Sequence, residues 1–160
     1  MKGYKLLDIG YINEYGHKYE FNKIYELKGD LKWNYNGFHF CTHIEDTLRY
    51  RDKNKDDFVI VEVLASGEIT DGSNLENDYY GYETGYASSK IQLLREVSRE
   101  ELINIVLKSK NIDRITRLIL SIPLTKEEIN LINDKCQNQI VTQYIEYYQY
   151  NQTEAFTRKR

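Results

Sequence analysis

The densest group of chemically capable side chains in this sequence lies within five positions. His39, Cys41 and His43 alternate along a short segment that follows a turn-forming Asn-Gly pair. Because successive side chains of a strand point to opposite faces, these three would share one face, opposite two phenylalanines. Imidazole and thiolate groups serve as metal ligands and as acid-base groups. The pattern is therefore compatible with two kinds of chemistry, metal binding and nucleophilic catalysis.

Metal binding at this segment lacks a visible fourth ligand. A structural zinc ion takes four ligands in a tetrahedron, whereas alternate residues of a strand lie about 6 to 7 Å apart. The remaining ligand would come from His17, Asp46 or Cys136. We therefore predict no bound metal and no cofactor. In this interpretation Cys41 is a small buried hydrophobic residue, His39 is hydrogen bonded to a neighbouring strand, and His43 caps the following helix.

Catalysis by side chains also lacks a complete set of groups. Cys41 has histidines nearby in sequence, but no Asn or Asp can be nominated as the third, orienting member. Glu62 and Glu68 flank the most apolar segment, where a carboxylate suits either a catalytic cleft or a solvated edge. The sequence contains no glycine-rich dinucleotide motif, no P-loop and no HExxH motif. No catalytic residue is assigned from the sequence.

The elements that would position these residues divide the chain into two halves. The first half predicts strands over residues 3–7, 19–27, 37–42, 58–66 and 87–97, with a short helix over 44–50. The nearly continuous apolar run at 58–64 predicts a central strand that is buried on both faces. From Ser98 the apolar period becomes helical, and capping boxes begin at Ser98 and Thr125. Further helices are expected over residues 111–122, which Pro123 ends, and over 137–148.

The predicted fold class is therefore α+β. It consists of an N-terminal, mainly antiparallel β-sheet with a short helix, followed by a C-terminal bundle of three or four short helices. The expected domains are a β-rich domain over residues 1–97, a helical segment over 98–150 packed on it, and a flexible tail over 151–160. The apolar content of the strands falls short of covering both faces of a sheet, so a fragment ending at Val97 is expected to fold poorly.

Composition narrows the classes of function. The net charge of −3 argues against general binding to nucleic acid, which usually requires a basic surplus. There is no run of about 18 apolar residues and no signal-peptide pattern, so no membrane association is expected. The two cysteines are too few for a disulfide framework, which agrees with a reducing compartment. These features together predict a soluble cytoplasmic protein.

Tyrosine is the unusual component, with 15 residues in a chain of 160. Tyrosine supplies large, stiff contact area and is favoured in protein interfaces. The segment over residues 71–85 combines tyrosine with acidic residues and glycine and predicts a long exposed loop, the kind of segment that often carries function. The candidate partner-binding residues in and beside this loop are Asp78, Tyr79, Tyr80, Tyr82, Glu83 and Tyr86.

Several motifs occur in an order that resembles an uncharacterised domain family found mainly in phage and prophage proteins. They are Gly3-Tyr4-Lys5, Tyr19-Glu20-Phe21, Asn36-Gly37-Phe38-His39-Phe40-Cys41, Val61-Glu62-Val63, Gly67-Glu68-Ile69 and Ala87-Ser88-Ser89-Lys90-Ile91. The resemblance covers residues 1–98 and brings no catalytic residues with it. It implies a phage accessory protein that binds and modulates a host protein, as an anti-CRISPR-like inhibitor of antiviral defence. Acidic and aromatic groups in the tyrosine-rich loop would imitate a nucleic-acid strand toward a basic effector.

A looser likeness is to ADP-ribosyltransferase-type domains, and it provides the alternative function. It implies that Lys5 or Tyr4 would meet NAD, that Phe38 and His39 would line the nicotinamide pocket, and that Glu68 would activate the acceptor. The chain departs from that pattern because no Arg or His stands at the expected position of the first strand. Likeness of fold alone does not confer activity. A weaker alternative is a scaffold that self-associates through its C-terminal helices, and the oligomeric state is left open.

Overall fold

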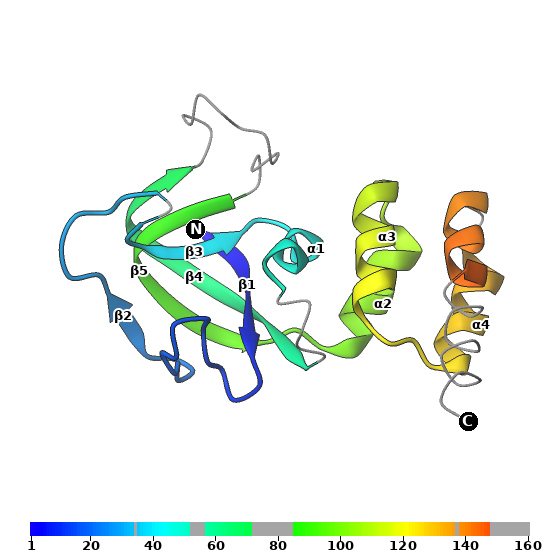
Figure 1. The fold of residues 1–160 in the computed structure, drawn as a ribbon, viewed down its shortest axis with the longest axis horizontal. Helices are drawn as coiled ribbons and strands as arrows, with labels where there is room; N and C mark the ends of the chain where they lie inside the picture. Colours follow the sequence, from blue (N-terminus) through cyan, green and yellow to red (C-terminus); the bar gives the residue numbers. More distant parts are fainter. Residues whose placement is uncertain (34, 52–56, 72–84, 137, 148–160) are drawn as a thin grey trace. The chain divides into compact units, whose positions relative to one another are not determined.

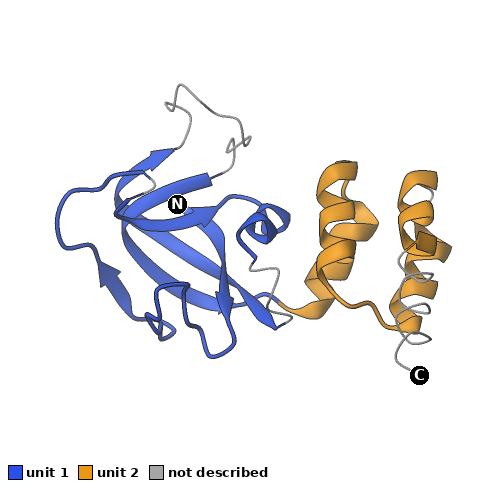
Figure 2. Cartoon of the chain, in the orientation of Figure 1, with its two compact units in different colours: residues 1–97 blue, residues 98–160 orange. Residues whose placement is uncertain are grey.

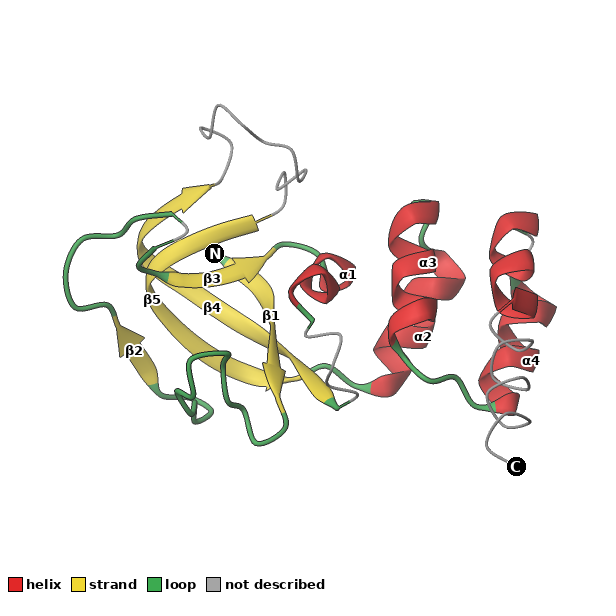
Figure 3. Ribbon diagram, viewed as in Figure 1, coloured by secondary structure: helices red, strands yellow, loops and turns green. Residues whose placement is uncertain are grey.

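The computed structural model describes residues 1–33, 35–51, 57–71, 85–136 and 138–147. The chain divides into two compact units, residues 1–97 and residues 98–160 (Figure 2). The first unit is built from strands with a short helix, and the second is built from helices (Figure 3). The α+β class predicted from the sequence is confirmed.

Five strands form the sheet in the described part of the first unit. They are β1 (Lys2–Asp8), β2 (Ile24–Glu26), β3 (Phe38–Cys41), β4 (Phe58–Asp71) and β5 (Gly85–Glu96). The short helix α1 (Ile44–Thr47) and the 3-10 turn η1 (Leu48–Tyr50) follow β3 (Figure 1). The strand order is β2-β5-β3-β1-β4, and β4 also pairs with β5. All pairings are antiparallel, so β1, β3, β5 and β4 close into a small barrel.

The most apolar strand is buried on both faces, as the sequence predicts, and β4 has a neighbour on each side because it pairs with β1 and with β5. Along β4, Ile60, Val61 and Val63 are each no more than 3% exposed, so both faces are covered. The strand runs five residues past its predicted end at residue 66. Gly67 adopts a φ of 73°, and the register with β5 shifts between Ser66 and Ile69. This bulge, which glycine makes possible, lets the strand bend and continue its pairing.

The strand predicted over residues 19–27 is wrong in its first half. Only Ile24–Glu26 forms a strand, β2, which pairs with β5. Asn22 adopts a φ of 61°, a left-handed conformation that asparagine tolerates but that lies outside the φ range of regular strands. Before this turn, Phe21 makes an isolated parallel bridge to Leu93. A local backbone preference therefore overrides the apolar pattern.

The core of the first unit is built by all four strands of the barrel. Its buried members come from the strands and from the segment between β1 and β2: Leu7, Tyr19, Phe40, Val61, Val63, Ala65, Ile91 and Leu93. Gly3 is part of the same packing, because a Cβ there would collide with the Phe40 ring and lie 2.7 Å from the Cys41 carbonyl oxygen. The close approach of β1 to β3 therefore requires glycine at this position.

The second unit contains α2 (Arg99–Lys108), α3 (Ile112–Ser121), α4 (Lys126–Lys135) and a further helix over residues 139–147. Both predicted capping boxes are present, with Ser98 and Thr125 as the caps. Within the described ranges, no helix is long and apolar enough to cross a bilayer. The packing of this unit on the sheet stays a prediction, and the predicted tail over residues 151–160 lies outside the described residues.

Candidate functional site

The wall of the barrel has a gap beside β1. In the described sheet, β1 and β3 share the single residue pair Tyr4–Cys41, whereas β1 pairs with β4 along its whole length. A cavity of about 800 Å³ lies along this gap. Its lining comes from β1, β2, β3, α1 and η1, and from the segments that follow β1 and precede β3. Within the described sheet, the second half of β1 pairs with β4 on one side alone, and its residues Lys5 to Asp8 line the cavity.

Lys5 is the central polar group of this cavity. It pairs with Val61 across β1 and β4, so its side chain starts from the same face as the barrel core. Its Nζ donates a hydrogen bond of 2.8 Å to the backbone oxygen of His39. The ammonium thus bridges β1 and β3 where backbone pairing is missing. Burial lowers the pKa of Lys5, and the charges of Glu14 and Cys41 oppose that shift.

Three aromatic rings form one wall of the cavity. His17, Tyr19 and Tyr25 meet edge to face, with ring centroids 4.7 Å, 5.2 Å and 5.0 Å apart. Tyr19 is 3% exposed, and burial raises the pKa of its phenol. The Tyr25 hydroxyl accepts a hydrogen bond from the backbone amide of Glu20. Edge-to-face contacts fix ring orientation, so this wall is pre-organised.

His39 lines the cavity, and its backbone oxygen is the atom that binds Lys5. Its Nε2 is buried with no hydrogen-bond partner in the part of the chain that the structure describes. The ring meets Trp33 edge to face at 5.3 Å. Burial, followed by the charge of Lys5, lowers the pKa of His39, which favours the neutral ring. The side-chain hydrogen bond expected from the sequence is not seen at Nε2.

Two exposed tyrosines border the same cavity. Tyr15 is 84% exposed and Tyr35 is 91% exposed, and both contribute to the cavity lining. Tyr15 belongs to the turn after β1, whereas Tyr35 belongs to the loop before β3. Such exposure is unusual for large aromatic side chains, which are mostly buried. The cavity therefore has a concave interior and a tyrosine-rich mouth.

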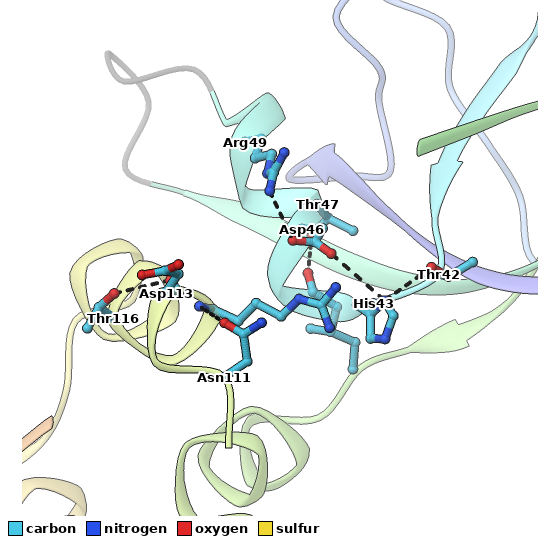
Figure 4. Close-up of polar contacts among 10 residues, drawn as sticks. Thr42, His43, Asp46, Thr47, Arg49, Asn111, Asp113 and Thr116 are labelled. Carbon is cyan, nitrogen blue, oxygen red and sulfur yellow. Dashed lines mark hydrogen bonds and ion pairs between the residues drawn. The ribbon is translucent and has the colours of Figure 1, made fainter. Parts of the chain in front are cut away.

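His39, Cys41 and His43 separate at the end of β3. His39 and Cys41 belong to the strand, and Cys41 is buried as predicted. His43 is the N-cap residue of α1, but its side chain makes no capping hydrogen bond. Figure 4 shows that it instead approaches Thr42 and Asp46, with 3.8 Å between its Nδ1 and the Asp46 Oδ2.

The described residues include no cluster of metal-ligating side chains. Among them, no group of three or more His, Cys, Asp or Glu side chains is close enough to hold a metal ion. Asp46 instead pairs with Arg49, at 3.7 Å between carboxylate oxygen and guanidinium nitrogen. The absence of a tightly bound metal stays a prediction.

The tyrosine-rich loop falls largely outside the described residues. This applies to five of the predicted partner-binding residues: Asp78, Tyr79, Tyr80, Tyr82 and Glu83. Tyr86, the sixth, lies near the start of β5 and stacks on Phe40 at a centroid distance of 5.7 Å. One face of the Tyr86 ring is therefore used in packing.

The residues that the transferase likeness selects are only partly brought together. Lys5 and His39 meet at the cavity, and Tyr4 and Phe38 also line it. Glu68 is exposed on the bulge of β4, where its backbone amide bonds to the Ser89 hydroxyl, and it does not line the cavity. The carboxylate that would activate an acceptor is therefore absent from this cavity.

Sequence reasoning missed the cavity's aromatic residues, His17, Tyr19 and Tyr25, and its mouth, Tyr15 and Tyr35. Tyr15 and His17 flank Gly16 in a turn, and such a polar turn carries no signal of a site. A usable signal was present in Lys5, a charged residue at an inward position of an otherwise apolar strand pattern.

The geometry defines the first unit as a small antiparallel barrel with a ligand-sized cavity in its wall. The chain belongs to the family called domain of unknown function DUF7666, whose model matches residues 1–105. Neither the curated proteins nor the solved structures contain a significant match.

Proposed function

We propose that this protein is a phage or prophage accessory protein that binds and modulates a host protein. The observation that carries the proposal is the pair of tyrosines, 84% and 91% exposed, at the mouth of a cavity of about 800 Å³. Tyrosine is enriched among residues that dominate binding energy, above all where it borders a concave surface. A partner that covers Tyr15 and Tyr35 would bury two large rings that are otherwise in water.

The motif resemblance supports the phage assignment and the class of partner. A host effector of antiviral defence, with a basic groove for nucleic acid, fits the acidic and aromatic residues over 78–83. The partner surface would then have two parts, the predicted loop and the tyrosine mouth of the cavity. Both parts are proposals, and they can be separated by mutation.

The test is affinity capture from lysate of a bacterial host, followed by measurement of binding to the purified partner. We expect Tyr15→Ala combined with Tyr35→Ala to weaken binding by about 2 kcal/mol or more, as loss of hot-spot residues does. Tyr147→Ala is the matched control, because it removes a tyrosine that is 60% exposed in the second unit. Tyr80→Ala combined with Tyr82→Ala tests the loop separately. Unchanged binding by both double variants would refute the proposal.

The alternative function is an ADP-ribosyltransferase-type enzyme. The observation in its favour is the contact of Lys5 with His39 at the cavity. Its test is incubation of the protein with host lysate and NAD, with detection of modified host proteins by mass spectrometry. Modification that requires NAD and disappears in Glu68→Gln would establish the enzyme. No NAD-dependent modification would exclude it.

Self-association is the weaker alternative. Among the described residues of the helical unit, four large hydrophobic side chains are exposed: Leu120 at 49%, Ile140 at 48%, Tyr144 at 37% and Tyr147 at 60%. Exposed apolar side chains that gather in a patch mark interaction surfaces. Analytical ultracentrifugation over a range of concentrations tests this reading, and a monomer at every concentration would exclude it.

A further inference from the structure

Lys5 is a cation that the cavity holds without a paired anion. Within the described residues, its Nζ bonds to a neutral acceptor, the His39 carbonyl, and no carboxylate lies within ion-pair distance of it. An ammonium has three donors, so further donors remain for another partner. Removing a charge from water without pairing it costs free energy. Lys5 therefore has a cost to stability that pairing with an anion would offset.

The charges around Lys5 limit what kind of anion fits. Glu14 and Asp8 also line the cavity and would repel a group that carries two negative charges. Arg49 already pairs with Asp46, and Glu26 pairs with Lys90. The Arg51 guanidinium also lines the cavity and lies over the Phe58 ring, 5.3 Å from its centroid. The Lys5 ammonium, which bonds to a neutral acceptor, is therefore complementary to a monoanion such as a carboxylate.

The remaining surface selects a flat ligand. The rings of His17, Tyr19 and Tyr25 form a fixed wall, held by centroid separations of 4.7 to 5.2 Å. Aromatic rings favour other rings in stacked or edge-to-face contact. The volume of about 800 Å³ falls within the range of small-molecule sites, which is about 300 to 1,000 Å³.

We propose that the cavity binds a small aromatic carboxylic acid, with its carboxylate on the Lys5 ammonium and its ring against the wall of His17, Tyr19 and Tyr25. The acid would occupy the interior of the cavity, whereas the proposed protein-binding surface is the mouth of the same cavity, at the exposed rings of Tyr15 and Tyr35. Binding of the acid requires no host partner. The two proposals can therefore fail independently.

The experiment is titration of the ¹⁵N-labelled full chain with 4-hydroxyphenylacetate, followed by amide chemical shifts. The uncharged 4-hydroxyphenylacetamide serves as the matched ligand. We expect saturable shifts at Lys5, Tyr19 and Tyr25 with the acid, and binding of the amide weaker by about tenfold, the usual worth of a hydrogen bond to a charged group. Equal binding of acid and amide, or no saturable shift with the acid, would overturn the proposal.

Variants assign the effect to the ammonium. Lys5→Met keeps the length of the side chain and removes its charge, so we expect it to weaken binding of the acid by about tenfold while the melting temperature stays equal or rises. Lys18→Met is the control, because Lys18 is an exposed lysine of the first unit, next to His17, and does not line the cavity. Retained affinity in a folded Lys5→Met would overturn the proposal. If Lys5→Met does not fold, the comparison of acid with amide on the natural protein still decides.

Discussion

Lys5 and Glu62 are two charged residues of the β1–β4 strand pair that differ in their partners. Across β1 and β4, Lys5 pairs with Val61 and Glu62 pairs with Tyr4, so the two charges belong to opposite faces. Glu62 is 8% exposed, but its carboxylate bonds to Lys2 at 2.8 Å and to Arg95 at 2.7 Å. Glu62 is thus a compensated structural charge, whereas Lys5 has no charged partner within ion-pair distance among the described residues. The contrast makes Lys5 the candidate for binding and Glu62 the candidate for stability.

Glu62 predicts a dependence of stability on pH. The hydrogen bond from Lys2, followed by its charge and by Arg95, lowers the pKa of Glu62 despite burial. The stabilisation is therefore complete above the unfolded pKa of about 4.3 and is lost as pH falls through the folded pKa. We expect Glu62→Gln to cost about 1 to 2 kcal/mol at neutral pH and progressively less in acid.

Urea unfolding at several pH values measures the effect of Glu62→Gln. The control is Glu68→Gln, because that carboxylate is exposed on the same strand and its substitution should change stability by less than about 0.5 kcal/mol. A loss for Glu62→Gln that stays constant between neutral and acidic pH would contradict the assignment.

Gly3 predicts a second effect at the residue scale. Gly3→Ala would place a methyl group against the Phe40 ring and 2.7 Å from the Cys41 carbonyl oxygen, so we expect a loss of about 2 to 3 kcal/mol from overpacking. Gly16→Ala is the control. Gly16 has a φ of 80° but nothing within 4 Å of the added carbon, so it should cost about 1 kcal/mol from backbone strain alone. Thermal unfolding compares the two, and an equal loss would show that packing at Gly3 is not tight.

At the scale of elements, an ion pair joins two helices of the second unit. Arg99, the first residue of α2, donates from Nε and Nη2 to the two carboxylate oxygens of Glu128, each at 2.7 Å. Glu128 is also the third residue of α4, where it completes the capping box of Thr125. The same carboxylate therefore holds a helix start and a helix pair. A bidentate arginine pair is the strong form of this interaction.

This pair predicts measurable coupling between α2 and α4. A double-mutant cycle with Arg99→Met and Glu128→Gln should give a coupling free energy of about 1 kcal/mol, since Arg99 is partly exposed. Thr125→Ala, which removes the cap and leaves the ion pair, should cost about 1 kcal/mol and add to the effect of Arg99→Met. Denaturant unfolding of the variants measures both terms. A coupling near zero would show that the pair contributes nothing between the helices.

At the scale of the whole molecule, closure of the barrel changes what the first unit needs. The apolar content of the strands predicts that the helices are required to cover the sheet. A closed barrel covers its inner face with its own strands, and residues 1–97 form a compact unit. We therefore expect the fragment 1–97 to give a dispersed amide spectrum, contrary to the expectation from composition.

The fragment 1–105, which spans the family match, is the control for the fragment ending at residue 97. If 1–105 folds and 1–97 does not, the part of α2 that ends at residue 105 belongs to the folding unit of the barrel. If neither fragment is soluble, the helical unit is required for the barrel to fold, as the composition argument holds.

The sequence by itself determined the local structure. Alternation, the apolar run at β4 and the capping boxes at Ser98 and Thr125 depend on residues close in the chain, and most of the elements appear near their predicted positions. The errors also have local causes, at Asn22 and at Gly67, where single residues adopt left-handed backbone conformations. The residue types of His39, Cys41 and His43 indicate possible chemistry, but the sequence does not show which side chains surround them in the fold.

Tertiary structure alone decided the site. The cavity depends on the pairing of β1 with β3 at a single residue pair, and closure depends on the contact of β4 with β5. The cavity brings together Lys5, Tyr19, Tyr25 and Tyr35, which come from four separate segments of the first unit. Periodicity reports whether a side chain faces inward, but it carries no information on which strands become neighbours or where a pairing stops. Those choices are long-range, and they turn an inward lysine into the centre of a cavity.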